Sequence, residues 1–498
     1  MGQRLSYSEL LYRRGFYIGP AGTSPASPDI VESVERWPAE NIGNMQLRHD
    51  PACLVQSVEI GCSKLTCIGI VFDIQRTVLP PARLLEQLLA AWATSWDAFF
   101  ERLMPCGGTF LLAVTGADGT VHLVPDATSS VQVCYAPHGE GWIAGSHPTL
   151  LADIIGEELS ELGRMWPAHK LFSAGGIYFP GIRTQFASVV YQTPNHRLSL
   201  ADGKVTRFFP TRDIVERPLS EILDIVCPMF RSQLDWAAEH YPLAIALSGG
   251  LDTRLTLAAS RDIADRALYF TWQVGSMAVH VEDMAVASQL TAHLGLRHQE
   301  VRGATYKDPD FRLAWSRMLH GTSNTPVEQQ ALYQAFPEGT LHIRSNILET
   351  VRGFYTKNAV NQPTRFTGNK LGRLFRGPTG GDLFTSEFEE FMEVTDFTSE
   401  TVRNYHYSDL FYWEHRMGVW LGSAVRSHRS RWETLSIYNN WLILEIMLGR
   451  PMAERNKALS VLAAAHRLWP ESMEVPIYSG NQYLDSAGIA AARLNGPA

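Results

Sequence analysis

The sequence has few cysteines, and their spacing does not suit a metal site. No Cys-x-x-Cys pair occurs, and no histidine stands at the spacing that a shared zinc site requires. The six cysteines are Cys53, Cys62, Cys67, Cys106, Cys134 and Cys227. We therefore expect reduced thiols in the core or at the surface.

Long apolar runs are also missing. The longest, such as residues 243–247, fall far short of the roughly 20 residues that a membrane-spanning helix needs. The opening residues, MGQRLSYSELLYRRGFYIG, lack the apolar stretch and cleavage site of a signal peptide. We therefore expect a cytoplasmic protein that does not contact a membrane.

Positive charge is in deficit, with 43 Lys and Arg against 51 Asp and Glu and a formal net charge of −8. This balance argues against extended contact with nucleic acid phosphates, although a local basic pocket stays possible. A hydrophobic content of 45% and a charged content of 19% over 498 residues are typical of a globular chain with two or three domains.

The predicted secondary structure changes near residue 210, from mainly strands to mainly helices. The first forty residues are rich in Pro, Ser and Gly and predict loops, whereas residues 53–209 contain short alternating runs typical of strands, interrupted by one helix at 82–103. The segment PTRDIVERP at 210–218 reads as a linker. We therefore predict a β-rich layered domain over residues 1–210 and a second domain over residues 218–498.

The second half predicts a parallel sheet. A helix at 219–241 precedes a strand at 243–247, a glycine turn and a helix to residue 260, and a second strand at 267–274 precedes a helix at 280–295. Strands that alternate with helices form parallel sheets with right-handed crossovers. The fold class expected is therefore α/β, with a helical carboxyl-terminal part.

The turn ALSGGLDTR at 246–254 is the most informative motif. Ligands of open parallel sheets bind beyond the carboxyl ends of the strands, where bare backbone N–H groups and a helix amino terminus attract anions. The turn lacks the glycine spacing of a Rossmann fingerprint and the Gly-Lys-Ser/Thr of a Walker loop. Taken alone, it could also be an ordinary tight turn between a strand and a helix.

The turn resembles the pyrophosphate loop of the ATP pyrophosphatases, in the form carried by asparagine synthetase, β-lactam synthetase and lasso-peptide cyclase. The resemblance implies that the loop and the end of the next strand bind ATP and that Asp252 binds Mg²⁺. It also implies that a substrate carboxylate becomes an acyl-adenylate from which an amine displaces AMP. The implied nucleotide-binding residues are Leu247, Ser248, Gly249, Gly250, Leu251, Asp252, Thr253, Arg254 and Thr271.

A second segment, SNILETVRGFY at 345–355, resembles the family segment that carries the second magnesium ligand. The resemblance puts Glu349 in that place, where the family has Asp, and a glutamate can also supply oxygen to Mg²⁺. Arg344 and Arg352 flank it and are assigned with Glu349 to catalysis, because a guanidinium can bind phosphate or carboxylate in bidentate fashion. An exposed helix start with surface arginines is the alternative interpretation.

The amino half resembles the glutaminase domain of asparagine synthetases, a sandwich of two sheets between helices. The family nucleophile is a cysteine at position 2, but Gly2 stands there. Without that thiolate no acyl-enzyme forms with glutamine by the family route. The amine is then expected on a substrate, with the amino half kept as a scaffold.

Several further positions stay open. Glu282 or Asp283 could face the substrate or simply begin a helix, and Tyr412 and Glu414 could help to deprotonate an amine although their spacing puts them on different helix faces. The family's late lysine has no clear counterpart, and Arg455 or Arg467 could replace its charge. The tryptophans at 413, 420, 432 and 441 are expected mostly in the core.

The leading hypothesis is an ATP-dependent, AMP-forming ligase that joins a carboxylate to an amine. Ring closure within one substrate, as in lactam-forming relatives in natural product biosynthesis, is the narrower expectation, and amidation between two molecules is an alternative. A degenerate homologue that binds nucleotide or a partner protein without turnover is a further alternative, and a homodimer or a pathway partner is possible. An RNA-modifying enzyme would need a basic surface or a zinc cluster, and the sequence indicates neither.

Overall fold

The amino half contains two antiparallel sheets of six strands each. The computed structural model describes residues 5–172, 176–273, 278–304, 307–320, 326–356, 361–479 and 482–483. The first sheet has the order β10-β8-β9-β1-β3-β2, with β1 Phe16–Gly19, β2 Ala39–Ile42, β3 Met45–His49, β8 Cys134–His138, β9 Gly141–Gly145 and β10 Val190–Tyr191. The second has the order β12-β11-β7-β6-β5-β4, with β4 Val55–Ile60, β5 Ser63–Asp73, β6 Cys106–Thr115, β7 Val121–Pro125, β11 His196–Ser199 and β12 Val205–Arg207.

The two sheets pack face to face between helices. One apolar cluster joins Phe16 and Ile18 of β1 to Leu111 of β6 and Leu123 of β7, so alternate residues of both sheets share a core. Helix α3 (Pro81–Thr94) contacts β4 and β5, and helix α5 (Pro148–Ile155) contacts β8 and β9. The predicted sandwich of two sheets between helices is confirmed.

Two local predictions in this half are wrong. The helix expected over 82–103 is two helices, α3 and α4 (Trp96–Leu103), because Ser95 is extended and its hydroxyl accepts the Ala98 N–H as an amino-terminal cap. The expected loops in the first forty residues include α1 (Tyr7–Leu10), α2 (Pro28–Glu35) and strand β1. Strand β1 is buried and pairs with both β9 and β3, so sheet pairing outweighs the local turn composition.

The carboxyl half contains the predicted parallel sheet, with the order β15-β14-β13-β16-β17. Its strands are β13 Leu243–Ala246, β14 Ala267–Trp272, β15 His298–Val301, β16 Leu341–Ile343 and β17 Glu433–Leu435. The chain moves outward from β13 to β14 and β15, then returns to place β16 on the other side of β13. The glycine turn therefore follows the central strand, at the point where the strand order reverses.

Helices cover both faces of this sheet. Helices α7 (Leu219–His240), α8 (Leu251–Ala259) and α18 (Leu459–Leu468) pack against one another, and Leu243 and Ile245 of β13 belong to the same large core. On the opposite face Ala244, Phe270 and Trp432 form a smaller cluster with residues of α11 (Pro326–Ala335). The other helices beside the sheet are η1 (Arg261–Ile263), α9 (Ala278–Leu294) and α10 (Pro309–Met318).

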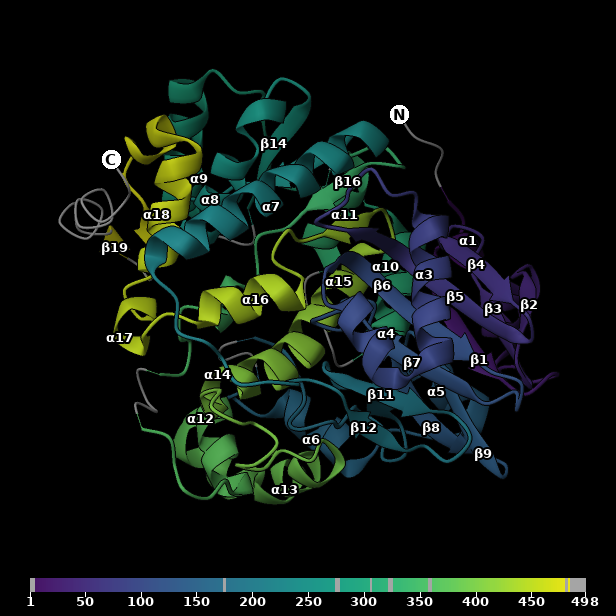
Figure 1. Ribbon diagram of the computed structural model, residues 1–498. Helices are drawn as coiled ribbons and strands as arrows, with labels where there is room; N and C mark the ends of the chain where they lie inside the picture. The colour runs from purple at the N-terminus through teal and green to yellow at the C-terminus, as the bar shows by residue number, and fades with distance from the viewer. Residues whose placement is uncertain are drawn as a thin grey trace.

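The rest of the carboxyl half is mainly helical, as predicted (Figure 1). A π-helix over Tyr412–Leu421 (η3) lies between α14 (Tyr407–Phe411) and α15 (Gly422–His428). The remaining elements are α6 Glu161–Ala168 in the amino half, then η2 Leu348–Thr350, α12 Gly368–Leu383, α13 Thr385–Val394, α16 Trp441–Leu448, α17 Met452–Arg455, η4 Pro470–Met473, β18 Tyr478–Ser479 and β19 Gln482–Tyr483.

The two halves meet through a buried polar contact. The Asn439 amide donates to Oδ1 of Asp126 at 2.9 Å and to the Gly108 carbonyl at 2.8 Å, and the Trp413 indole donates to the Ala127 carbonyl. The largest apolar core also draws residues from both halves. Division at residues 210–218 stays a prediction. Of the helices in the described segments, none has the length and apolar content to span a membrane.

Candidate functional site

The glycine turn is shaped by its own hydroxyls. Oγ of Ser248 accepts the Gly250 N–H at 3.1 Å, and Oγ1 of Thr253 lies 3.1 Å from the same oxygen. The Gly249 N–H donates to Oδ1 of Asp283 at 3.0 Å. A Cβ at Gly249 would come 3.1 Å from Cβ of Tyr478 and 3.2 Å from that Asp283 oxygen, so close packing explains the glycine. Asp283 therefore contacts the turn and holds its backbone, a role that the sequence did not predict, and a role toward substrate for Glu282 or Asp283 stays a prediction.

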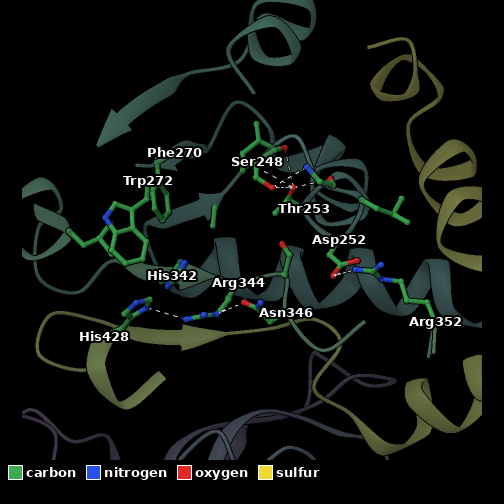
Figure 2. Close-up of a pocket in the computed structure, with 16 residues that line it drawn as sticks. Ser248, Asp252, Thr253, Phe270, Trp272, His342, Arg344, Asn346, Arg352 and His428 are labelled. Carbon is green, nitrogen blue, oxygen red and sulfur yellow. Dashed lines mark hydrogen bonds and ion pairs between the residues drawn. The ribbon is translucent and has the colours of Figure 1, made fainter. Parts of the chain in front are cut away.

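The turn opens into a cavity of about 300 Å³ at the carboxyl edge of the sheet. Figure 2 shows Asp252 and Arg352 on one side, Trp272, His342 and His428 on the other, and Arg344 with Asn346 between them. The wall contains Ala246, Leu247, Ser248, Gly250, Leu251, Asp252, Thr253, Phe270, Trp272, Leu332, His342, Arg344, Ser345, Asn346, Arg352 and His428. Six predicted nucleotide-binding residues and two predicted catalytic arginines thus surround one space.

Asp252 and Glu349 form an acidic pair beside this cavity. Nη2 of Arg352 lies 2.9 Å from Oδ2 of Asp252 and 3.6 Å from Oε1 of Glu349. The other oxygen of each carboxyl group, Oδ1 of Asp252 and Oε2 of Glu349, is buried and has no hydrogen-bond partner in the described part of the chain. Segments 97 positions apart in the sequence are therefore brought together as the resemblance implied.

The pair has unusual electrostatics. Burial, followed by the negative charge of Glu349, raises the pKa of Asp252 to about 7, while the Arg352 guanidinium opposes the rise. Burial acts to lower the pKa of Arg352, but the charges of Asp252 and Glu349 outweigh it and raise that pKa. At pH 7 the Asp252 carboxyl group is therefore about half protonated in the absence of another cation.

This arrangement fits Mg²⁺. Two buried carboxylate oxygens receive no hydrogen bond from the described residues, so both can coordinate a cation. Mg²⁺ commonly binds one or two carboxylates together with substrate phosphates and water. No group of three metal-binding side chains occurs among the described residues. The site therefore suits a cation that arrives with a nucleotide better than a cation held by protein ligands alone.

Arg344 lies on the cavity wall just beyond β16. Its Nε donates to Oδ1 of Asn346, and Nη1 lies 3.4 Å from Nδ1 of His428. Burial lowers the pKa of Arg344 to about 10, with a small opposing effect of Glu349. Burial and the nearby Arg344 charge lower the pKa of His342 and His428 well below the usual value. Both imidazoles are therefore neutral at pH 7.

Arg254 does not face the cavity. Its Nη1 donates to the carbonyls of Ser472 and Val475, each at 2.7 Å, and Nη2 donates to that of Pro476 at 3.1 Å. The side chain leaves α8 on the side opposite Asp252, because residues two positions apart on a helix are rotated by about 200°. The prediction that Arg254 binds the nucleotide is therefore not supported, and its observed role is to attach the carboxyl-terminal segment to α8.

Thr271 and Gly249 support the turn without lining the cavity. Oγ1 of Thr271 donates to the Leu247 carbonyl at 2.9 Å and lies 2.8 Å from Nε2 of His298. Gly249 faces Asp283 and Tyr478. Their expected contact with a nucleotide stays a prediction.

Other candidates lie elsewhere. Glu414 is buried against Arg207 and accepts a hydrogen bond from the Asn195 amide at 3.1 Å. Tyr412 has a different environment, in which burial and then the charge of Glu349 raise the pKa of the Tyr412 hydroxyl. These two residues therefore do not form a pair. Arg455 pairs with Asp409 at 2.9 Å, and Arg467 pairs with Asp224 at 2.6 Å, so neither extends into the cavity.

Eight of the sixteen wall residues were not among the predicted site residues. Three of these eight have aromatic rings that carry nitrogen, namely Trp272, His342 and His428. His342 and Arg344 are two positions apart at a strand end, a spacing that puts both side chains on one face. The alternation of the strand at 341–345, LHIRS, was therefore enough to place His342 beside Arg344. The residues around His428, RSHRS at 426–430, contain no pattern that relates it to that strand. The tryptophans at 413, 432 and 441 are buried in the core, as predicted.

The cysteines offer little nucleophilic chemistry. Gly2 lies outside the described residues. Burial raises the pKa of Cys53, Cys106, Cys134 and Cys227 to about 12 and also raises that of Cys67, and Cys62 is the remaining, exposed thiol. Thiols of this kind are protonated at neutral pH and therefore inert.

Comparison with known proteins adds no family assignment. No protein-family profile and no curated sequence matches the chain. Among solved structures, glutamine phosphoribosylpyrophosphate amidotransferase from B. subtilis is 10% identical with a TM-score of 0.24, covering 70% of this chain and 73% of that one. A structure described as the allosteric regulatory enzyme of purine biosynthesis is 10% identical with a TM-score of 0.24, covering 76% and 74%. Glutamine-dependent NAD⁺ synthetase from Acinetobacter baumannii is 14% identical with a TM-score of 0.17, covering 51% of each chain. Likenesses at these scores carry no inference, so the functional argument depends on the site itself.

Proposed function

We propose that this protein is an ATP-dependent, AMP-forming amide-bond synthetase that works without hydrolysing glutamine. The observation that carries the proposal is the Asp252 and Glu349 pair, in which each carboxylate keeps one buried oxygen without a hydrogen-bond partner among the described residues. The pair stands beside a glycine turn at the carboxyl edge of a parallel sheet, where anionic ligands bind.

In this proposal the turn and the following helix bind the phosphates of ATP, and the acidic pair binds Mg²⁺. The first N–H groups of α8 bind phosphate oxygens, because these groups and the helix dipole favour negative charge there. The N–H groups of Gly249 and Gly250 donate within the protein, to Asp283 and Ser248, and so keep the shape of the turn. Asp252 and Glu349 hold Mg²⁺, which when bound would offset the charge that builds on the leaving pyrophosphate. Arg352 pairs with Asp252 at 2.9 Å, and in this proposal its guanidinium binds a phosphate oxygen once Mg²⁺ is held by the two carboxylates.

The chain's own residues orient the reacting groups. Asp283 fixes the Gly249 backbone, and Ser248 and Thr253 fix the shape of the turn, so the phosphates meet a preformed surface. Neither the buried thiols nor Gly2 offers a nucleophile for glutamine, so the attacking amine belongs to a substrate. Ring closure within one molecule is the narrower proposal, and amidation between two molecules by the same site is its alternative.

A second candidate is a homologue that binds nucleotide without turnover. The contact that favours it is the Arg352 guanidinium, which already neutralises Asp252 and lies close to Glu349. No lysine lines the described cavity wall to stabilise charge at adenylation. In this candidate Arg352 replaces the metal permanently and the site carries out no chemistry.

The deciding experiment compares products and metal dependence. Purified protein is incubated with ATP labelled at the α-phosphate, Mg²⁺ and a library of amino acids and short peptides, and the nucleotide products are separated. Formation of AMP and pyrophosphate that is lost in Asp252→Ala and retained in the surface variant Arg302→Gln supports the synthetase. Formation of ADP contradicts the adenylation mechanism, and tight ATP binding without Mg²⁺ favours the non-catalytic candidate.

A further inference from the structure

Arg344 is a cation on the cavity wall without an acidic partner. Within the described chain no carboxylate forms an ion pair with it, and no residue accepts a hydrogen bond from its Nη2. Among the buried arginines, Arg14 pairs with Glu433 at 3.5 Å and Arg455 with Asp409 at 2.9 Å. Arg254 has no carboxylate partner, but its guanidinium donates to three backbone carbonyls. Removing a charge from water without such partners is costly, so the open Nη2 of Arg344 calls for an anion from outside the chain.

The side chains around Arg344 are hydrogen-bond donors. The Trp272 indole Nε1 is buried without a partner among the described residues, and so are both ring nitrogens of His342. The rings lie close together, with centroids 5.9 Å apart for Trp272 and His428 and 5.5 Å apart for His342 and His428. Each neutral imidazole carries one N–H, so Arg344, Trp272 and the two histidines together present several donors to one region.

These donors suit a ligand group that only accepts hydrogen bonds. A carboxylate or phosphate accepts without donating, and the planar guanidinium binds such groups in bidentate fashion. A divalent cation is repelled here, and a nucleobase leaves the Arg344 charge unbalanced. Asp252 lies across the same cavity, so an anion at Arg344 and a metal ion at Asp252 are held in one space by opposite sets of residues (Figure 2).

We infer that Arg344, with Trp272, His342 and His428, binds a second anionic group of the acyl donor, so that the substrate of this enzyme is a dicarboxylic compound. One carboxylate would be activated beside Asp252 and Glu349, and the other would be held at Arg344. The inference depends on the proposed function for the role of the first carboxylate. The same oxyanion chemistry could come from a nucleotide phosphate, and the experiment below separates the two sources.

The probes are linear dicarboxylates, namely malonate, succinate and glutarate, with propionate and butyrate as matched monocarboxylates. Binding is measured by calorimetry without nucleotide, and MgATP binding is measured separately, in wild type, Arg344→Gln and Arg302→Gln. Arg302 is an exposed arginine that pairs with Glu300 on the edge strand β15, so its variant controls for loss of one positive charge. Arg344→Lys keeps the charge without the planar fork and replaces Arg344→Gln if that variant does not fold.

We expect at least one dicarboxylate to bind wild type about tenfold more tightly than its matched monocarboxylate, and Arg344→Gln to lose about tenfold of that affinity. Arg344→Lys should lose less, and MgATP affinity should stay within about twofold of wild type in all variants. Equal binding of monocarboxylates and dicarboxylates, or no saturable binding of either, overturns the inference. A tenfold loss of MgATP affinity in Arg344→Gln assigns the anion to the nucleotide and also overturns it. Because the dicarboxylate arm contains no nucleotide, its result stands even if ADP is later found as the product and the proposed function fails.

Discussion

Oδ2 of Asp252 and Nη2 of Arg352 lie 2.9 Å apart although the residues are 100 positions apart in the chain. The contact joins two segments that follow neighbouring strands. Asp252 stands at the start of α8, directly after β13, and Arg352 stands in the segment after β16. Because β16 is parallel to β13, their carboxyl ends reach the same edge of the sheet. The acidic site is therefore a direct product of strand order.

Asp252→Ala should abolish stabilisation of the protein by MgATP. A ligand that binds only the folded state raises the melting temperature, and Asp252 supplies one of the two proposed metal ligands. The measurement is the melting temperature with and without MgATP. Arg302→Gln, which removes an exposed charge directly after β15, should keep the full shift, whereas an unchanged shift in Asp252→Ala would place the nucleotide elsewhere.

Glu349→Ala should impair turnover more than binding. If Glu349 helps to offset charge that develops on pyrophosphate, its loss costs on the order of 10²-fold in kcat while ATP affinity stays within about an order of magnitude. Glu349→Asp should recover part of the rate. Release of AMP and pyrophosphate is followed with the substrate found above, and normal turnover by Glu349→Ala would remove this residue from the site.

The stability of the metal-free protein should fall as pH rises from about 4 to about 7. The pKa of Asp252 is raised to about 7 in the folded protein, so over this window the folded state binds more protons than the unfolded state, and stability declines with pH. Urea unfolding at pH 5, 6, 7 and 8 without Mg²⁺ measures the slope. Asp252→Asn should flatten it, and an identical slope in that variant would show that other groups cause the decline.

The same proton should be released when the metal binds. A carboxylate must lose its proton to coordinate Mg²⁺, so affinity for MgATP should increase between pH 6 and pH 8. Calorimetry at pH 6.5 in buffers of different ionisation enthalpy reports the protons released, with close to one expected. No release in wild type would mean that Asp252 is already ionised.

Arg254→Met should destabilise the fold by roughly 2–4 kcal/mol, because three carbonyls at residues 472, 475 and 476 lose their charged donor. Denaturant unfolding measures the change. Arg261, nearby in the chain and largely exposed, pairs with Glu471 at 3.9 Å, and Arg261→Gln should have little effect. Equal losses in the two variants would contradict a structural role specific to Arg254.

The protein should not release glutamate from glutamine. The five buried thiols have raised pKa values, and the exposed Cys62 lies in the tight turn between β4 and β5. A coupled glutamate assay on wild type and Cys62→Ser should give only background for both. Glutamate release that survives replacement of every cysteine would reveal another nucleophile.

The sequence was informative where chemistry and local geometry coincide. The turn at Ser248 and the acidic residue at Glu349 could be found from short motifs, because the residues that shape them are neighbours in the chain. The orientation of Arg254 could not be found that way, since it depends on carbonyls more than 200 positions away. His428 and Trp272 were missed for the same reason: each lines the cavity only because β14, β16 and α15 meet there.

The contact between Asn439 and Asp126 also bears on how this chain could have evolved. The amino half supplies buried acceptors to the carboxyl half, and the carboxyl half supplies the amide that satisfies Asp126. A gene shortened to the carboxyl half would expose these buried groups to water, and recombination that exchanged one half would mismatch both. We therefore expect the two halves to be inherited together.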